Sequence, residues 1–212
     1  MWFSLRLALA FTLLAVPALS ACSSDDKGVS GGDAGTHPSG DGSQPVVDSS
    51  GIFPSDNDWN RDVSGDDVDP NSANYIAKMA PGTGMHADFS NIVDGNFGIP
   101  YVVVPGDQAK VPINFTGSPT QSDPGPYPIP LDIPLEANGQ SDSHAIAVDL
   151  TNHKLYELYL AVRGGSGFEA YSGAIFDLTS NALRPDGWTS ADAAGLPIFP
   201  GLVRYDEAVQ RG

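Results

Sequence analysis

Glycine and proline set the main limit on how this chain can fold. The sequence of 212 residues contains 24 Gly and 18 Pro, about a fifth of the chain against about 12% in average usage. Both residues interrupt regular elements, so the apolar residues fall into short runs between turns. Hydrophobic residues still make up 41% of the chain, too many for wholesale disorder. The sequence therefore predicts a mainly β domain, a sandwich or a jelly-roll-like fold, with one or two short helices.

The first 21 residues are typical of a secretory signal peptide. Arg6 precedes an apolar stretch from Leu7 to Leu19, which is too short for a bilayer core that needs about 20 residues. The segment ends in Leu19-Ser20-Ala21-Cys22, which resembles the lipobox of bacterial lipoproteins. Cys22 is also the only cysteine in the chain, so no intramolecular disulfide can form.

The lipobox resemblance implies that Cys22 becomes the first mature residue, with a diacylglyceryl group on its sulfur and a palmitate-like acyl chain on its amine. Each buried methylene adds about 0.8 kcal/mol, so several chains hold a domain at a membrane. Ser23 at the next position implies the outer membrane if the cell is Gram-negative. The alternative is an ordinary signal peptide in which Cys22 has no role.

Residues 22–50 form the predicted tether between anchor and domain. They are rich in Ser, Gly and Asp and contain no aromatic residue, so they cannot bury enough apolar surface to offset their ordering entropy. Apolar residues return near Ile52. Residues 51–212 match the size of one β-rich globular domain.

Two predicted elements lie in the first half of this domain. A helix is expected over 71–80, with Asp69 as its cap, Pro70 at its first position and Tyr75, Ile76 and Met79 on its inward face. Tyr101 to Val104 and Lys110 to Phe115 flank a Pro-Gly-Asp turn and suggest a hairpin. Pro112 would place the second of these strands at a sheet edge.

The second half contains the clearest strand signals. A proline-rich segment, Ser122 to Asn138, is expected to be an irregular covering segment. His144 to Leu150 and Leu155 to Val162 predict a hairpin that pairs Leu150 with Leu155 and is covered on both faces. Phe168 to Leu178 follows as a third strand, and Thr189 to Gly195 as one helical turn.

The charge balance disfavours a nucleic-acid partner. The chain has 26 acidic against 10 basic side chains, a net charge of −16, whereas proteins that bind a phosphate backbone present clustered Lys and Arg. The acidic residues are spread over the predicted tether, residues 51–69 and the rest of the domain. This spread favours a solvated acidic surface over the binding of one cationic partner.

The densest acidic cluster, residues 56–69, raises the hypothesis of a Ca²⁺ site. Asp56, Asp58 and Asn60 begin like an EF-hand loop. Arg61 then stands where that loop needs Gly, and Asp67 where it needs Glu. Solvated turn aspartates explain the same cluster without a metal.

Carboxylate acid/base chemistry has three candidate residues, Glu157, Asp177 and Asp186. A glycosidase needs two carboxyls roughly 5 to 10 Å apart, and an acidic residue at the centre of an apolar strand, such as Glu157, must be paired, metal-bound or in a cleft. The predicted pairing places His144 too far from Glu157 for a direct dyad. Structural roles for both residues stay open, and no Gly-x-Ser-x-Gly motif is present.

Aromatic residues raise a second hypothesis, a platform on which a glycan stacks. Trp59 and Trp188 lie in Asp-rich stretches and are the leading members; the wider set adds Tyr127, Tyr156, Tyr159 and Tyr171. Aromatic faces beside carboxylates suit sugar binding. Packing in a β core is the competing explanation. The alternatives are thus a membrane-anchored lipoprotein without assigned activity, and one that binds or cleaves carbohydrate.

Most of the domain resembles an uncharacterised group of secreted bacterial proteins. The matching runs are Phe53–Asn60, Gly98–Gly106, Lys154–Tyr159 and Ala182–Ser190. The group has no established activity, so the resemblance implies no catalytic residue. Members of the group are extracellular and continue beyond the stretch that matches Tyr205-Asp206-Glu207, which implies a domain truncated at its C-terminus.

Overall fold

The computed structural model describes residues 47, 52–79, 82, 84, 98–204 and 207, all within one compact unit, Asp41–Gly212. The predicted signal peptide and Cys22 lie outside the described residues, as do the tether apart from Val47 and most of the chain after Arg204. Val47 is buried. No helix in the described ranges is long and apolar enough to cross a membrane.

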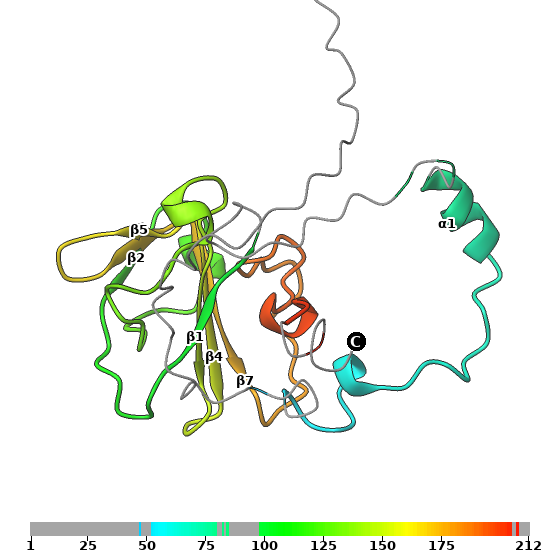
Figure 1. Ribbon diagram of the computed structural model, residues 1–212, viewed down its shortest axis with the longest axis horizontal. Coiled ribbons are helices and arrows are strands. Elements are labelled where there is room, and N and C mark those ends of the chain that lie inside the picture. The colour runs from blue at the N-terminus through cyan, green and yellow to red at the C-terminus, as the bar shows by residue number, and fades with distance from the viewer. Residues whose placement is uncertain are drawn as a thin grey trace, which may run out of the picture. The chain divides into compact units, whose positions relative to one another are not determined.

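Four strands form the larger sheet, in the order β1-β3-β4-β7 (Figure 1). They are β1 (Tyr101–Val103), β3 (Ala145–Asp149), β4 (Lys154–Tyr159) and β7 (Ser172–Asp177). β1 runs parallel to β3, whereas β3 with β4 and β4 with β7 are antiparallel.

A second sheet has the order β2-β6-β5. Its strands are β2 (Ile113–Phe115), β5 (Val162–Arg163) and β6 (Phe168–Ala170); β2 runs parallel to β6, and β5 is antiparallel to it. The remaining elements are short: helix α1 (Ser72–Lys78) and the 3₁₀ turns Asp58–Asn60, Pro119–Gln121, Glu136–Gly139 and Phe199–Gly201. Short strands in two sheets confirm the predicted mainly β, sandwich-like domain.

The hairpin predicted between Tyr101 and Phe115 is wrong, because β1 and β2 belong to different sheets. The Asn152 side chain donates to the Gly106 carbonyl at 2.8 Å, so the turn after β1 docks on the β3–β4 turn. A Cβ on Gly106 would lie 2.6 Å from Thr151, a contact that only glycine avoids. The edge position that Pro112 predicts for β2 is confirmed.

The β3–β4 hairpin forms as predicted, with a shifted register. Val148 pairs with Leu155 and Ala145 with Leu158, where the sequence suggested Leu150 opposite Leu155. The Asp149 carboxylate accepts hydrogen bonds from the backbone and side-chain amides of Asn152, at 2.8 and 2.7 Å. The turn therefore starts one residue early. Because the register shifts by an even number of residues, each strand still presents the predicted side chains to each face of the sheet.

The single strand predicted from Phe168 to Leu178 is instead two strands in different sheets, β6 and β7. Tyr171 lies between them and donates its backbone N–H to the Tyr159 carbonyl. The carbonyl of Tyr171 accepts from Gly117 and Ser118, outside the larger sheet. These bonds move the chain from one sheet to the other at Tyr171.

Helix α1 confirms the predicted helix with shorter bounds, but the predicted cap is wrong: the N-cap is Asn71, which makes no side-chain cap hydrogen bond, and Asp69 accepts the Asn71 N–H in the turn before the helix. The predicted inward face is wrong: the exposed fractions are 58% for Tyr75, 53% for Ile76 and 74% for Met79. Seven residues form two turns, too few to place a continuous apolar stripe against a sheet.

The stretch Thr189–Gly195 forms a turn, Asp192 to Gly195, rather than a helix.

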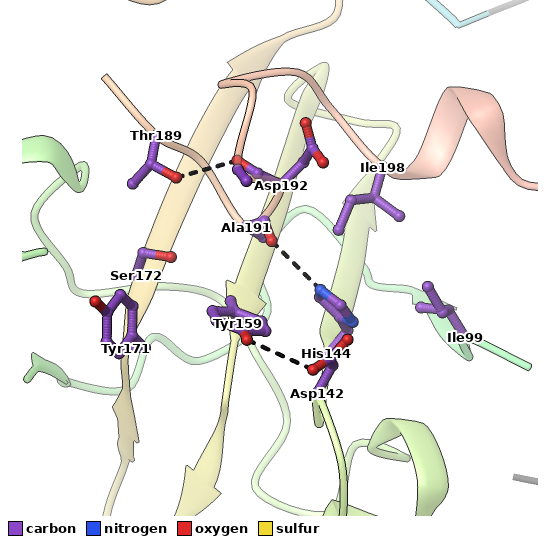
Figure 2. A pocket seen from close by; sticks show the side chains of 11 residues that line it. Ile99, Asp142, His144, Tyr159, Tyr171, Ser172, Thr189, Ala191, Asp192 and Ile198 are labelled. Carbon is purple, nitrogen blue, oxygen red and sulfur yellow. Dashed lines mark hydrogen bonds between the residues drawn. The ribbon is translucent and has the colours of Figure 1, made fainter. Parts of the chain in front are cut away.

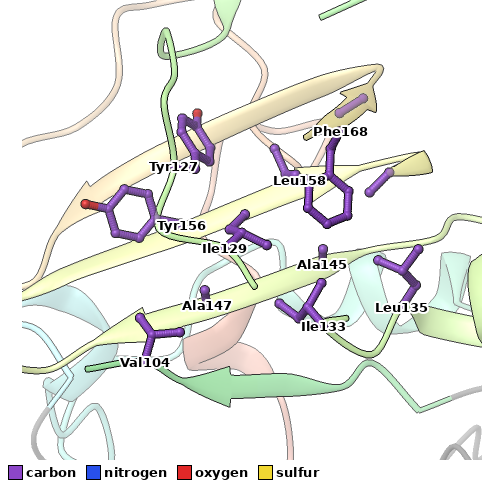
Figure 3. Close-up of a cluster of buried hydrophobic side chains, with 12 residues drawn as sticks. Val104, Tyr127, Ile129, Ile133, Leu135, Ala145, Ala147, Tyr156, Leu158 and Phe168 are labelled. Carbon is purple, nitrogen blue, oxygen red and sulfur yellow. The ribbon is translucent and has the colours of Figure 1, made fainter. Parts of the chain in front are cut away.

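Both faces of the larger sheet are covered, as the sequence predicted. On one face, Tyr127, Ile129, Ile133 and Leu135 from the proline-rich segment pack over Ala145, Ala147, Leu158 and Phe168 (Figure 3). This is the irregular covering segment expected for 122–138. On the other face, Ile146, Val148, Leu155, Ala174 and Phe176 pack with Val47, Ile52 and Phe199.

Candidate functional site

One end of the larger sheet presents three side chains in a row. His144 immediately precedes β3, Tyr159 ends β4 and Ser172 begins β7; Tyr159 pairs with Ser172, and Ala145 with Leu158. The next position beyond the Ala145 pair is His144 opposite Tyr159. These residues line a cavity of about 490 Å³, which we call the sheet-end cavity (Figure 2). Its position on strand ends gives it a rigid base.

His144 is held by Glu136 behind the cavity. The Glu136 carboxylate lies 2.5 Å from His144 Nδ1 and accepts the His144 backbone N–H at 3.3 Å. The Glu136 N–H in turn donates to the His144 carbonyl at 3.0 Å. The other ring nitrogen faces the Ala191 carbonyl at 3.3 Å (Figure 2). Because both nitrogens face oxygen acceptors, the ring orientation is fixed and Glu136 offsets any charge on it.

Two tyrosines continue the aromatic lining. The Tyr159 ring lies 5.4 Å from the His144 ring and 5.8 Å, edge to face, from the Tyr171 ring. Tyr171 is 44% exposed and packs against Gly117, where a Cβ would lie 2.2 Å from its ring. The Tyr159 hydroxyl approaches Asp142 Oδ1 at 3.5 Å, and burial and Asp142 raise the pKa of Tyr159. The cavity thus offers aromatic faces with a hydroxyl and a carboxylate at the rim.

A loop from Thr189 to Ile198 forms the opposite wall of the cavity. Thr189 Oγ1 donates to the Asp192 carbonyl at 3.1 Å (Figure 2), and Ser190 Oγ donates to the Leu196 carbonyl at 2.6 Å. Asp192 Oδ2 accepts the Ala194 N–H at 3.0 Å. The loop is therefore tied to itself by hydrogen bonds and carries the Asp192 carboxylate to the cavity.

Glu157 fastens this loop to the sheet. It is completely buried in β4, and its carboxylate accepts the N–H groups of Ile198 and Phe199 at 3.0 and 2.8 Å. Burial raises the pKa of Glu157 to about 7, although the two backbone donors pull it down and Asp192 adds to the rise. The buried glutamate is paired, one of the outcomes the sequence left open, and its partners are backbone groups.

A second cavity of about 380 Å³, the Trp59 groove, lies between the 53–59 segment and the 180–184 and 195–197 stretches. Trp59 is 45% exposed there, and Leu183 and Leu196 are also exposed. Asn181 donates to Asp56 at 3.0 Å and accepts from Asn57 at 2.9 Å. The groove combines an aromatic face with amide groups that are already engaged with one another.

The three carboxylates predicted for acid/base chemistry occupy different surroundings. Glu157 lies under the Ile198 backbone, whereas Asp177 binds Lys154 at 2.7 Å and Thr179 at the end of β7. These bonds hold the pKa of Asp177 well below its usual range. Asp186 is exposed on the loop before Trp188. The structure does not bring the three together in either cavity.

The two tryptophans also lie apart. Trp59 lines the groove named after it, whereas Trp188 packs against the Arg184 guanidinium, 5.6 Å from its ring. Arg184 is buried, ion-paired with Asp123, and also lines the Trp59 groove. Of the wider aromatic set, the structure instead gathers Tyr159 and Tyr171 in the sheet-end cavity.

The Ca²⁺ candidates have other hydrogen-bond partners. The Asn60 side chain donates to the Ile52 and Pro54 carbonyls, both at 2.9 Å. Asp56 accepts from Asn181, and Asp58 lies 3.9 Å from Arg61. Within the described residues, no group of three or more His, Cys, Asp or Glu is arranged to hold a metal ion.

Sequence reasoning did not find Glu136 or Asp142. Glu136 lies near the end of the irregular proline-rich segment, and its contact with His144 depends on how that segment returns to the sheet. Asp142 stands two residues before His144, and an acidic residue next to a strand histidine was a weak signal for it. The nearness of Tyr171 depends on the strand break at that residue, which no local pattern predicted.

The fold and the cavity define a two-sheet β domain with an aromatic and acidic cavity at one sheet end. Comparisons with protein-family models, curated proteins and solved structures found no match to this chain.

Proposed function

We propose that this protein is a lipid-anchored extracytoplasmic protein whose β domain binds carbohydrate in the sheet-end cavity. The observation that carries the carbohydrate part is the joint lining by Tyr159 and Tyr171 with Asp142 and Asp192. Aromatic faces pack on the C–H surface of a sugar ring, and carboxylates accept hydrogen bonds from its hydroxyls. The cavity volume of about 490 Å³ lies within the range of small-ligand sites.

The surroundings of the carboxylates favour binding over glycoside cleavage. Cleavage needs an acid and a second carboxylate on either side of one bond. Glu157 is covered by the Ile198 and Phe199 backbone, and Asp177 is engaged with Lys154. The carboxylates that reach the sheet-end cavity, Asp142 and Asp192, suit hydrogen bonding to hydroxyls.

A glycan array probed with the full chain in detergent tests the carbohydrate part. We expect binding to a restricted set of glycans, with affinity reduced roughly tenfold by Tyr171→Ala, because one stacking face is worth about 1 kcal/mol or more. Tyr171 is partly exposed, so its removal should leave the fold intact. The matched control is Tyr75→Ala on α1, which should bind as the unaltered chain does. Absence of glycan binding, or equal loss in the control, would contradict the proposal.

The anchor rests on sequence alone, through the lipobox pattern that ends at Cys22. Several acyl chains on that residue would hold the mature chain at a membrane surface. Expression in a bacterium that processes lipoproteins, followed by detergent-phase partitioning, tests it. Cys22→Ser should move the protein to the aqueous phase, whereas Ser24→Ala should not. Equal partitioning of the Cys22→Ser variant and the unaltered chain would refute the anchor.

A further inference from the structure

We infer that the saccharide bound in the sheet-end cavity carries a free ammonium group, as a deacetylated amino sugar does. This inference rests on the proposed carbohydrate binding and narrows it to one ligand class. It depends on the charge balance of the lining, on the aromatic faces beside the carboxylates and on a contrast with the Trp59 groove.

The charges that line the sheet-end cavity leave a negative excess. Its carboxylate and imidazole groups belong to Asp142, Asp192 and His144, and the Glu136 carboxylate lies beside the His144 ring. Asp192 has one oxygen bonded to the Ala194 N–H, and Asp142 Oδ1 accepts from the neutral Tyr159 hydroxyl. Among the described residues, neither Lys nor Arg lines this cavity. The described lining therefore carries two acidic residues and no Lys or Arg.

This arrangement discriminates among saccharide classes. An acidic sugar would meet two like charges, and a neutral sugar would supply only neutral hydroxyl donors. An ammonium group can donate charge-assisted hydrogen bonds to a carboxylate, which are roughly twice as strong as neutral ones. It can also lie over a tyrosine face, where the ring quadrupole attracts a cation. Tyr159 and Tyr171 supply such faces beside Asp142.

The Trp59 groove also combines aromatic and acidic residues, but its acidic residues have polar or cationic partners and Arg184 belongs to its lining. Asp58 lies 3.9 Å from Arg61, Asp56 accepts from Asn181, and Arg184 itself lines the groove. A cationic ligand would gain less there than in the sheet-end cavity. The preference for an ammonium sugar should therefore belong to one cavity and not to the acidic surface as a whole.

A matched pair of oligosaccharides tests the inference. The probes are a tetrasaccharide of glucosamine and its fully N-acetylated form, titrated calorimetrically into the full chain in detergent. We expect the free-amine probe to bind at least tenfold more tightly. Asp142→Asn and Asp192→Asn should each remove most of that preference without abolishing binding of the acetylated probe. Asp58→Asn in the Trp59 groove lowers the net negative charge equally and should leave the preference unchanged.

The outcomes separate this inference from the proposed function. Equal affinity for both probes, with loss on Tyr171→Ala, would overturn the ammonium preference and leave carbohydrate binding standing. A preference that Asp58→Asn reduces as much as Asp192→Asn does would show general attraction to an acidic chain, and would also overturn it. If neither probe nor any arrayed glycan binds, both proposals fail.

Discussion

The two faces of the larger sheet are closed in different ways. On the face that bears Ala145, Ala147 and Leu158, the proline-rich segment supplies the apolar side chains that pack on the sheet. On the opposite face, the apolar cluster around Ile146 and Phe176 also contains the fully buried Glu157 and ends at His144. The face covered by the proline-rich segment is thus closed mainly by apolar side chains, whereas the other face also contains the buried carboxylate of Glu157.

This difference explains where the cavity forms. A covering segment that packs through apolar side chains follows the sheet closely and leaves little space. The 189–198 loop is instead fixed at a few points, where Glu157 accepts its N–H groups and where His144 meets the Ala191 carbonyl. Between those points the loop stands away from the strand ends. These polar contacts therefore hold the 189–198 loop in place as a wall of the cavity and do not fill the space between the loop and the strand ends.

The largest expected effect is on the face covered by the proline-rich segment. Leu158→Ala removes a fully buried side chain and should lower the free energy of unfolding by about 2 to 5 kcal/mol, through lost transfer free energy and a residual cavity. Chemical denaturation measures this loss. Leu183→Ala, at a residue that is 89% exposed, is the matched control and should change stability by less than about 0.5 kcal/mol. Similar losses in both variants would contradict the assigned core.

Glu157 gives the second effect, which depends on pH. Its pKa is raised to about 7 in the folded state, chiefly by burial, with Asp192 and Arg184 as the nearby charges. The folded protein therefore holds a proton there that the unfolded chain releases. The contribution of this proton to the free energy of unfolding is fully present below the usual pKa range of a carboxyl group. It is lost as the pH rises toward 7. We expect the difference in unfolding free energy between the unaltered chain and Glu157→Gln to change by a few kcal/mol between pH 4 and 8.

The sign of that change is the test. Relative to Glu157→Gln, the unaltered chain should lose stability as the pH rises, because only its buried group must ionise. Denaturant titrations at several pH values, on both proteins, provide the comparison. A difference that stays constant with pH, or one that grows in favour of the unaltered chain at pH 8, would contradict the assignment.

These two faces also show how far sequence reasoning reaches. The β3–β4 hairpin and both of its faces follow from local alternation, because neighbouring strands pair through a short turn. The partners of β1 and β2 do not, since each pairs in parallel with a strand distant in the chain. The site divides in the same way: Tyr159 and Tyr171 belong to the aromatic set predicted from the sequence, but their position in one cavity with Asp192 depends on non-local packing.

The third effect concerns the contact between Glu136 and His144 at the sheet-end cavity. Glu136→Gln keeps the shape but removes the charge that faces His144 Nδ1 at 2.5 Å. We expect a loss of about 1 to 2 kcal/mol in the free energy of unfolding, as for a hydrogen bond to a charged group, and a weaker affinity for an ammonium ligand because a negative charge near the cavity is removed. Denaturation and calorimetry measure the two effects. Tighter binding of the cationic probe would contradict the assigned charge balance.

The smallest effect lies at the solvated end of β7. Asp177→Asn breaks the ion pair with Lys154. The Asp177 side chain is 42% exposed and the Lys154 side chain is 35% exposed. Such pairs contribute less than about 1 kcal/mol. Because the pKa of Asp177 is lowered, its contribution should be present above the usual carboxyl range and fade as the pH falls. A loss of activity toward a carbohydrate in this variant, at unchanged stability, would restore Asp177 as a candidate catalytic carboxylate.

The sheet-end cavity is the proposed binding site, and a direct measurement of ligand contact there is the strongest test. Ring-labelled tyrosines in the full chain, followed by NMR during titration with the glucosamine tetrasaccharide, test it directly. The account predicts that the Tyr159 and Tyr171 ring signals shift together and saturate at one affinity, while those of the fully buried Tyr127 and of Tyr75 on α1 stay in place. Saturable binding that leaves Tyr159 and Tyr171 unshifted would contradict it.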